Sequence, residues 1–350
     1  MSLVNRLARP EILALKAYSH AAWEPSLQRM HANELPWRVA GDSSQAGLNR
    51  YPEPQPPPLV RGMAAFYGVD PSCLLVGRGS DEAIDLLLRV FCRAGQDNIL
   101  VCPPTYSMYA VAAGIQGAGV VNVPLRGDGF ELDVEAVLAR VDASIKLVFV
   151  CSPNNPTGNA LPREHVLRLA DALAERALVV VDEAYVEFMP EGSSVAPLVG
   201  SRPNLVVMRT LSKSHGLAGA RCGALIATPE LIALARKVIP PYAITEMTVE
   251  VVAPLLQPAG IAAMRQRVQD ILAERERLSA ALARLPCVLR QWPSEGNFIL
   301  ADFADADEAL RRVRGAGLII RDMRQAALPR ALRISVGTPD QNNTLLQALQ

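Results

Sequence analysis

Short apolar runs recur along the chain between residues 74 and 227, and helical or turn-like segments separate them. The runs are rich in β-branched residues, which is typical of buried strands. We predict strands at 74–76, 99–102, 119–123, 147–151, 178–181, 205–208 and 224–227. Helices are predicted between them at 84–91, 133–140 and 163–175. This alternation predicts an α/β fold with a mainly parallel sheet that helices cover on both faces.

The pattern changes beyond Pro240. Residues 266–284 have the charge and periodicity of a long helix, and two short strands around another helix follow, ending at 331–336. These elements predict a smaller α+β domain. The first 50 residues show little periodicity apart from a short helical segment at 10–18. We therefore expect an N-terminal arm that packs with the small domain (1–45), a large domain (46–245) and a small C-terminal domain (246–350).

A run of prolines lies between the arm and the first predicted strand. Five prolines fall within residues 52–58. Proline fixes φ and has no N–H to donate, so we expect extended or polyproline backbone here and no helix. By composition alone this run is a linker.

Composition narrows the range of partners. Half of the 350 residues are hydrophobic and a fifth are charged, which is ordinary for a globular chain. The formal net charge is zero and no lysine-arginine run is present, so nucleic acid and membrane surfaces are not expected partners. Residues 1–10 lack the apolar stretch of a signal peptide. Residues 110–125, the most apolar segment, are interrupted by glycines and amides and do not predict a membrane span.

The cysteines and histidines give no sign of a metal site. The six cysteines form no C-x-x-C pair, and the four histidines lie far apart in the sequence. We therefore expect free thiols in a reducing cytoplasm and no bound metal.

Lysine is rare in this chain, and one lysine lies in an unusual setting. The chain has only four, at positions 16, 146, 213 and 237, against thirty-one arginines. Lys213 follows the apolar run 205–208, within the sequence Arg209-Thr-Leu-Ser-Lys-Ser. A lysine can lose its proton and attack a carbonyl, whereas an arginine cannot, so the position favours amine chemistry. Polar residues also follow other predicted strands, at Tyr106, Asn155 and Asp182, and ligands of such sheets bind at strand ends.

Four segments in this order resemble the fold-type I pyridoxal-phosphate aminotransferases, and most closely the histidinol-phosphate aminotransferases. They are Cys-Ser-Pro-Asn-Asn-Pro-Thr-Gly at 151–158, Val-Val-Val-Asp-Glu-Ala-Tyr at 179–185, Ser-Lys at 212–213, and Arg221. The resemblance covers nearly the whole chain. It implies a large domain with a seven-stranded type of sheet, a smaller α+β domain, and pyridoxal 5'-phosphate as cofactor.

The resemblance also implies roles for individual residues. Lys213 holds the cofactor covalently and later moves the substrate proton, and Asp182 pairs with the ring nitrogen. Tyr185 and Asn155 bind the phenolic oxygen, and Tyr106 covers the ring face. Ser212, Arg221 and the helix start after Gly79 bind the cofactor's phosphate, because free backbone N–H groups at a helix start bind anions. The candidates at that helix start are Ser80, Asp81 and Glu82.

In the family, the tyrosine of an Arg-Tyr-Pro motif crosses a homodimer to the neighbour's cofactor phosphate, a role that falls here to Tyr51. The arm also offers Tyr18 and Asn33 as substrate-binding candidates. In the small domain, Arg333 corresponds to the residue that binds the substrate's acidic group. Arg321 supplies a second guanidinium, which a phosphate dianion favours, unless it merely pairs with its neighbour Asp322.

These residues predict transfer of an amino group between L-histidinol phosphate and 2-oxoglutarate, giving imidazole acetol phosphate and glutamate in histidine biosynthesis. A threonine-phosphate decarboxylase and an aromatic amino acid aminotransferase of the same fold remain alternatives. A catalytically silent regulator built on this fold is a further alternative. The presence of Lys213, Asp182 and Arg221 argues against it.

Overall fold

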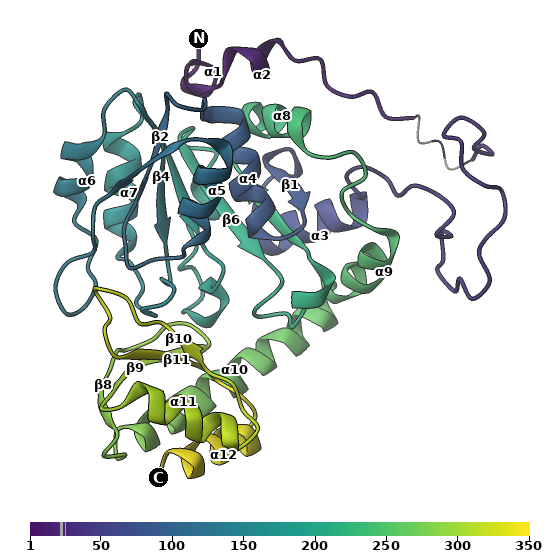
Figure 1. The fold of residues 1–350 in the computed structure, drawn as a ribbon. Coiled ribbons are helices and arrows are strands. Elements are labelled where there is room, and N and C mark those ends of the chain that lie inside the picture. Colours follow the sequence, from purple (N-terminus) through teal and green to yellow (C-terminus); the bar gives the residue numbers. More distant parts are fainter. Residues whose placement is uncertain (22–23, 25) are drawn as a thin grey trace.

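The computed structural model describes residues 1–21, 24 and 26–350. The chain forms a large domain around one sheet and a smaller domain around a second sheet (Figure 1). The large sheet has seven strands in the order β1-β7-β6-β5-β4-β2-β3. Its strands are β1 (Leu74–Gly77), β2 (Asn98–Val101), β3 (Gly119–Asn122), β4 (Ile145–Cys151), β5 (Leu178–Asp182), β6 (Leu205–Thr210) and β7 (Gly223–Ile226). The predicted α/β fold and all of its large-domain strands are present.

The large sheet is mostly parallel. Strands β3, β2, β4, β5 and β6 pair in parallel, and β7 runs antiparallel to both β6 and β1. Every residue of β5 is buried, because helices cover both of its faces. This two-sided burial explains why the strands appear in the sequence as continuous apolar runs rather than as alternating ones.

Two sets of helices cover the sheet. One face packs on α3 (Pro57–Tyr67), α6 (Val134–Arg140) and α7 (Arg163–Ala172). The other face packs on α4 (Ser80–Phe91), α5 (Met108–Gln116) and α8 (Pro229–Val238). Successive residues of a strand point to opposite faces, so Val179 and Val181 belong to the first layer and Val180 to the second. Asp182, one residue further, therefore lies on the α5 side.

The proline run differs from its prediction. Its last two residues, Pro57 and Pro58, begin α3, and Pro56 is the N-cap. Proline is well suited to the first turn of a helix, because its fixed φ is helical and the N–H that it lacks has no partner there in any case. The run is therefore non-helical only up to Pro56, and its end starts a helix that packs on the sheet.

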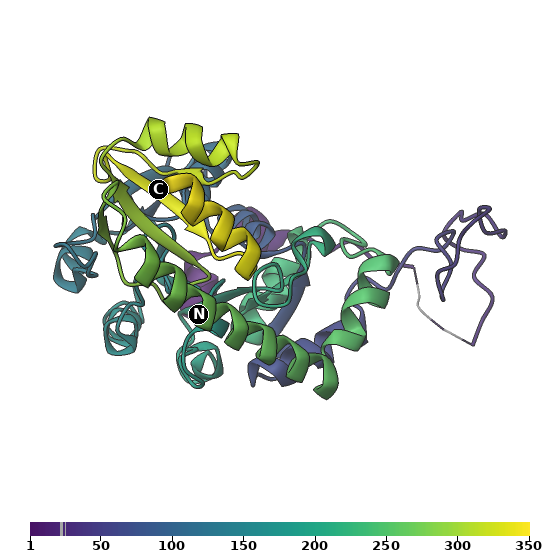
Figure 2. The ribbon, with the colours of Figure 1, turned by 90° about the horizontal axis from the view of Figure 1, so that it is seen from below.

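The small domain is attached through a long helix. α9 (Glu246–Leu255) still packs on α3, and α10 (Pro258–Leu282) then runs from the large domain to the small sheet (Figures 1 and 2). The transition between domains therefore falls along α10 rather than at 245/246. The small sheet has the order β10-β11-β9-β8. Its elements are β8 (Val288–Gln291), β9 (Phe298–Phe303), α11 (Ala306–Gly315), β10 (Arg321–Asp322), β11 (Ala331–Ser335) and α12 (Pro339–Leu349).

The two faces of the small sheet differ. Helices α10, α11 and α12 cover one face through Ile299, Ala301, Leu332 and Ile334. The intervening residues, such as Leu300 and Arg333, point the other way, toward the large domain. This second face contributes to the candidate site.

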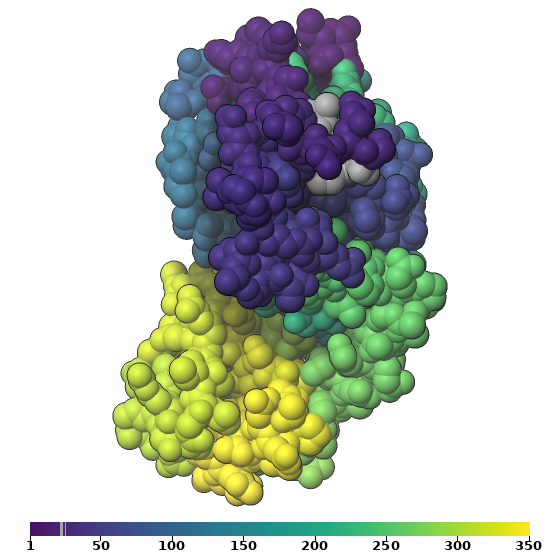
Figure 3. Space-filling view, turned by 90° about the vertical axis from the view of Figure 1, so that its right-hand side faces the viewer, coloured from purple at the N-terminus to yellow at the C-terminus, as the bar shows by residue number. Residues whose placement is uncertain are grey.

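The N-terminal arm begins on the large domain. Helices α1 (Leu3–Leu7) and α2 (Pro10–Ala14) pack beside α4 and α8. The described residues between α2 and α3 project away from the body of the large domain (Figure 1). Seen from that side, the arm lies in front of the large domain (Figure 3). Within one chain, the expectation that the arm packs with the small domain is therefore not met. Among the described residues, no single helix is long and apolar enough to cross a membrane, and only the bent pair α9–α10 meets both criteria together.

Candidate active site

One cavity brings together most of the predicted site residues. It has a volume of about 450 Å³ and lies at the carboxyl ends of β4, β5 and β6, facing the small sheet. This is the size of a small-molecule site. The predicted residues that line it are Ser80, Asp81, Tyr106, Asn155, Asp182, Tyr185, Ser212, Lys213, Arg221, Arg321 and Arg333.

Asp182 forms the buried end of the cavity. Its side chain is 3 % exposed, and burial raises the pKa of its carboxyl to about 6. The hydroxyl of Tyr109 donates a hydrogen bond to Oδ2 at 2.7 Å, and the backbone N–H of Ala184 donates to Oδ1 at 3.1 Å. Both donors favour the ionised form and limit the effect of burial. A buried carboxylate of this kind suits a cationic partner in the cavity.

Lys213 lies in the turn that follows β6, and β6 is the neighbour of β5, the strand that ends in Asp182. Its Nζ is 5.7 Å from the centre of the Tyr185 ring. Desolvation and the guanidinium of Arg333 lower the pKa of its amine, and the carboxylates of Asp81 and Asp182 oppose that shift. A lowered pKa increases the fraction of neutral amine, which is the nucleophilic form.

Asn155 links the large domain to the small one. Its amide Nδ2 donates to the hydroxyl of Tyr185 at 3.3 Å, and its Oδ1 accepts a hydrogen bond from the guanidinium of Arg333. Burial raises the pKa of Tyr185, so its hydroxyl remains protonated and able to donate. The three side chains form a continuous polar wall along one side of the cavity.

A cluster of donors closes the opposite end. The guanidinium of Arg221 donates to the carbonyls of Arg78 (3.1 Å) and Ala218 (3.2 Å) and is 3.4 Å from the carboxylate of Asp81. Ser80 and Asp81 begin α4, where the first backbone N–H groups have no helical partner. Gly79 has a φ of +93°, a backbone conformation that residues other than glycine rarely adopt, and it lies against the Arg221 guanidinium. A helix start beside an arginine and Ser212 is suited to a phosphate.

Two arginines of the small domain face this cavity together. Arg321 on β10 is directly opposite Arg333 on β11, and both line the cavity. The carboxylate of Asp322 forms an ion pair with the guanidinium of Arg324, with an N–O distance of 2.8 Å. Arg324 also forms an ion pair with Asp307. In the part of the chain that the structure describes, no ion pair joins Arg321 to Asp322. The alternative in which these neighbours pair is therefore not what the structure shows.

Four predicted residues lie outside the cavity. The side chain of Glu82 packs against the loop before α4. Its carboxylate accepts hydrogen bonds there from the backbone N–H (2.7 Å) and the guanidinium of Arg78. This corrects its assignment to the cofactor, because the helix start presents Ser80 and Asp81 instead. Tyr51 stacks on Tyr242 with ring centres 4.6 Å apart. Tyr18 and Asn33 lie on the projecting arm, away from the cavity of their own chain.

Sequence reasoning missed several residues of this site. Tyr109 contacts Asp182 although 73 positions separate them. A signal was available, since Tyr109 comes three positions after the predicted Tyr106, and the two rings meet edge to face with centres 5.6 Å apart. Met323 and Gln325, just beyond Arg321, also line the cavity, and their sequence context carries no distinguishing pattern.

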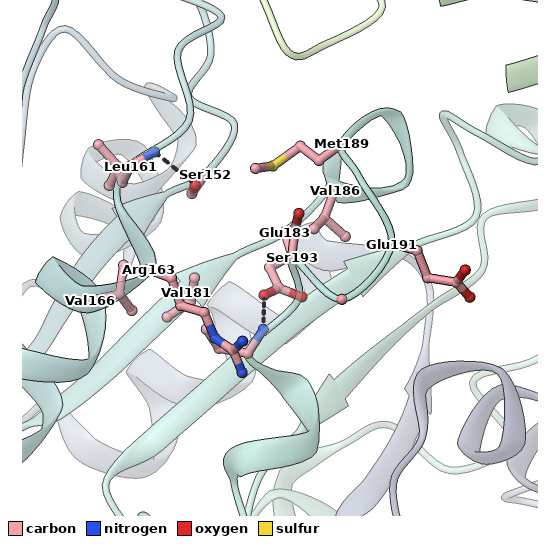
Figure 4. A pocket seen from close by; sticks show the side chains of 12 residues that line it. Ser152, Leu161, Arg163, Val166, Val181, Glu183, Val186, Met189, Glu191 and Ser193 are labelled. Carbon is pink, nitrogen blue, oxygen red and sulfur yellow. Dashed lines mark hydrogen bonds between the residues drawn. The ribbon is translucent and has the colours of Figure 1, made fainter. Parts of the chain in front are cut away.

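A second cavity, of about 260 Å³, lies on the α7 side of β5 (Figure 4). None of the predicted residues lines it. Its most buried charge, Glu183, already accepts hydrogen bonds from the N–H of Val195 (2.7 Å), the hydroxyl of Ser194 (2.5 Å) and the guanidinium of Arg209 (3.1 Å). Ser152 likewise accepts from the N–H of Leu161. The buried polar groups Glu183 and Ser152 are therefore hydrogen-bonded within the protein, and no lysine is among the described residues that line this cavity.

A lysine and a buried aspartate at neighbouring strand ends, beside a helix start with an arginine, define a pyridoxal-phosphate-dependent transferase of fold type I. The model of the family "Aminotransferase class I and II" matches residues 21–349, and the chain belongs to that family.

Named relatives agree. A histidinol-phosphate aminotransferase of Stenotrophomonas maltophilia (strain R551-3) is 47% identical, over 99% of this chain and 96% of that protein. One from Xylella fastidiosa (strain 9a5c) is 49% identical, over 92% and 88%. A solved structure of the Sinorhizobium meliloti histidinol-phosphate aminotransferase, in complex with pyridoxal-5'-phosphate, has a TM-score of 0.77 and 28% identity, and the match covers 86% of this chain and 82% of that one.

Proposed function

We propose that this protein is a pyridoxal-phosphate-dependent aminotransferase that moves the amino group between L-histidinol phosphate and 2-oxoglutarate in histidine biosynthesis. The products are imidazole acetol phosphate and glutamate. The observation that carries the choice of substrate is the cross-strand pair Arg321–Arg333 in the cavity. Like charges directly opposite each other destabilise a sheet, so the pair is best explained by an anion that binds between them.

The cavity fits the cofactor at both of its charged ends. Asp182 is a buried carboxylate with room beside it for a ring N–H, and Ser80, Ser212 and Arg221 converge where the phosphate belongs. Lys213 lies between these ends and provides the amine that holds the cofactor. Pyridoxal phosphate, when bound, supplies an electron sink for the bonds at the substrate's Cα.

The remaining chemistry belongs to the protein. Asp182 keeps a proton on the cofactor's ring nitrogen. Tyr185 and Asn155 donate hydrogen bonds toward the phenolic oxygen, and Tyr106 provides a flat face against the ring. The freed Nζ of Lys213 would move the proton between Cα of the amino substrate and C4′ of the cofactor. Its lowered pKa suits this work near neutral pH.

Two substrates share the anion site in turn. The phosphate of histidinol phosphate carries more charge than a carboxylate and engages both Arg321 and Arg333. Glutamate places its α-carboxylate on Arg333, which Asn155 holds in position. Arg321 is exposed on the short strand β10, so it adds attraction mainly for the dianion.

The working unit is a homodimer, and the exposed side chains of the arm are the observation that supports it. Among the described residues from Tyr18 to Tyr51, eight large apolar or aromatic side chains are exposed, with Met30 at 93 % and Trp37 at 77 %. They are Tyr18, Leu27, Met30, Leu35, Trp37, Val39, Leu48 and Tyr51. An exposed apolar surface of this kind is typical of a contact with another protein. A second copy of the chain covers it, and Tyr51 then reaches the neighbour's cofactor phosphate, with Tyr18 and Asn33 near the neighbour's substrate.

The protein works in the cytoplasm. All six cysteines are free thiols, and five of them are buried, as suits a reducing compartment.

A panel assay tests this function. The purified protein, loaded with pyridoxal phosphate, is given histidinol phosphate, phenylalanine or threonine phosphate, each with 2-oxoglutarate. We expect the highest kcat/KM for histidinol phosphate. Faster transamination of phenylalanine supports an aromatic aminotransferase instead, and release of carbon dioxide from threonine phosphate supports the decarboxylase.

A further inference from the structure

Tyr109 is the deepest polar contact of the site. Its side chain is fully buried, and its ring stacks on Phe149 with ring centres 4.8 Å apart. The hydroxyl lies 2.7 Å from Oδ2 of Asp182. A buried tyrosine needs a hydrogen-bond partner, and this one is fixed by α5 and by the stacked ring rather than by a flexible loop.

The two oxygens of Asp182 have different donors. Oδ2 accepts from Tyr109, and Oδ1 accepts from the N–H of Ala184. One donor on each oxygen fixes the plane of the carboxylate. Burial and the adjacent Asp182 raise the pKa of Tyr109 well above its ordinary value, so its hydroxyl remains a donor throughout the physiological range.

We propose that Tyr109 is a positioning residue that keeps Asp182 ionised and aimed at the ring nitrogen of the cofactor. The inference rests on the proposed cofactor chemistry and extends it to a residue that does not touch substrate. Without the hydroxyl, Asp182 keeps a single donor in a buried place. It then takes up a proton more readily and can no longer pair with a protonated ring.

Other groups around Asp182 do not replace this contact. The nearby carboxylates of Asp81 and Glu183 favour its protonated form, as burial does. The other titratable groups that interact with it are Tyr106, Tyr185, Cys151 and Lys213. None of these four has a hydrogen bond to Asp182 within the described part of the chain, so Tyr109 is the side-chain donor that opposes burial.

The test compares Tyr109→Phe with Tyr67→Phe. Tyr67 is the matched control, since it is also a buried tyrosine of the large domain but its hydroxyl has no partner among the described residues. Carboxyl ¹³C NMR of the full chain without cofactor gives the pKa of Asp182, and Asp182→Asn assigns the signal. Because Tyr109→Phe removes a hydrogen bond to a charged group, the pKa of Asp182 should rise by about 1 to 2 in that variant. It should not change in Tyr67→Phe.

The holoenzyme supplies two further readouts. In Tyr109→Phe the dissociation constant of pyridoxal phosphate should rise about tenfold or more, and the acidic limb of kcat should move up by the same pKa shift. An unchanged pKa with an affinity within about twofold of the wild type overturns the proposal. If Tyr109→Phe does not fold, 3-fluorotyrosine at position 109, a stronger donor, should lower the pKa of Asp182, and no shift or a rise overturns the proposal.

The apo measurement separates this inference from the proposed function. A wild-type protein that binds no pyridoxal phosphate contradicts the function, whatever the pKa of Asp182. A wild type that binds the cofactor, with Asp182 unaffected by Tyr109→Phe, contradicts only the role of Tyr109.

Discussion

Arg321 and Arg333 lie directly opposite each other on antiparallel strands, with both side chains on the face of the small sheet that lines the cavity. Desolvation lowers the pKa of Arg333, and the charge of its neighbour Arg321 acts in the same direction. Each arginine has a separate position in the sheet, so their contributions can be measured one at a time.

The first prediction concerns Arg321→Ala. A charged hydrogen bond lost from a phosphate costs about 1.5 to 3 kcal/mol, so kcat/KM for histidinol phosphate should fall roughly 10- to 150-fold. The glutamate half-reaction should fall much less, because Arg333 serves the carboxylate. Single-turnover kinetics of both half-reactions measures this. Arg324→Ala is the control, since that neighbouring arginine pairs with Asp307 and Asp322 outside the cavity. Equal losses in both half-reactions contradict the assignment.

The second prediction concerns Lys213. The wild type should be yellow, and borohydride should bleach it and fix the cofactor on the peptide that contains Lys213. Lys213→Ala should still bind the cofactor through Asp182 and Arg221 but lose turnover. Peptide mass spectrometry checks the attachment point. An adduct on Lys16, Lys146 or Lys237 rejects the site described above.

The third prediction tests whether the active site is shared between subunits. Tyr51→Phe should weaken cofactor binding by about 1 kcal/mol, the worth of one hydrogen bond. Mixed dimers of Tyr51→Phe and Lys213→Ala subunits should regain one wild-type site, because that site takes Lys213 from one chain and Tyr51 from the other. Cofactor titration of the purified mixed dimer counts such sites. If Tyr51 serves its own chain, no wild-type site appears.

The fourth prediction concerns pH and Asp182. Its folded pKa of about 6 lies above the ordinary 3.8, so the native protein holds this proton more tightly than the unfolded chain does. Stability of the cofactor-free protein is therefore lost as pH rises through this window. Asp182→Asn escapes that loss, so its advantage in free energy of unfolding should grow by about 2 kcal/mol between pH 4.5 and 7. Urea titrations at both pH values measure the difference, and a constant gap argues against a raised pKa.

The large sheet and its reactive strand ends were predictable because they depend on local pattern. The run 178–182 is buried on both faces, so it appears as an unbroken apolar segment that ends in Asp182. The same holds for the strand before Lys213. In parallel strands the carboxyl ends lie at one edge, which brings such residues together without further information.

Other features depend on contacts that sequence spacing does not reveal. The bond between Tyr109 and Asp182 joins distant segments, and Glu82 turns to Arg78 because that loop has unsatisfied donors. The start of α3 inside the proline run reflects its packing on the sheet. The arm folds onto α8 through Leu3, Val4 and Leu7, an apolar set too short to indicate its partner.

The strand that carries Arg321 has only two residues and lies at the edge of the small sheet. So short an edge is held by few hydrogen bonds, among them the one from the N–H of Met323 to the carbonyl of Ala331 at 3.1 Å. Segments of this kind open locally at a small cost in free energy, well below that of global unfolding. An anion bridging Arg321 and Arg333 adds a tie across that edge. Amide hydrogen exchange at residues 321–323 should therefore slow when a phosphorylated substrate binds, while exchange in β9 stays unchanged.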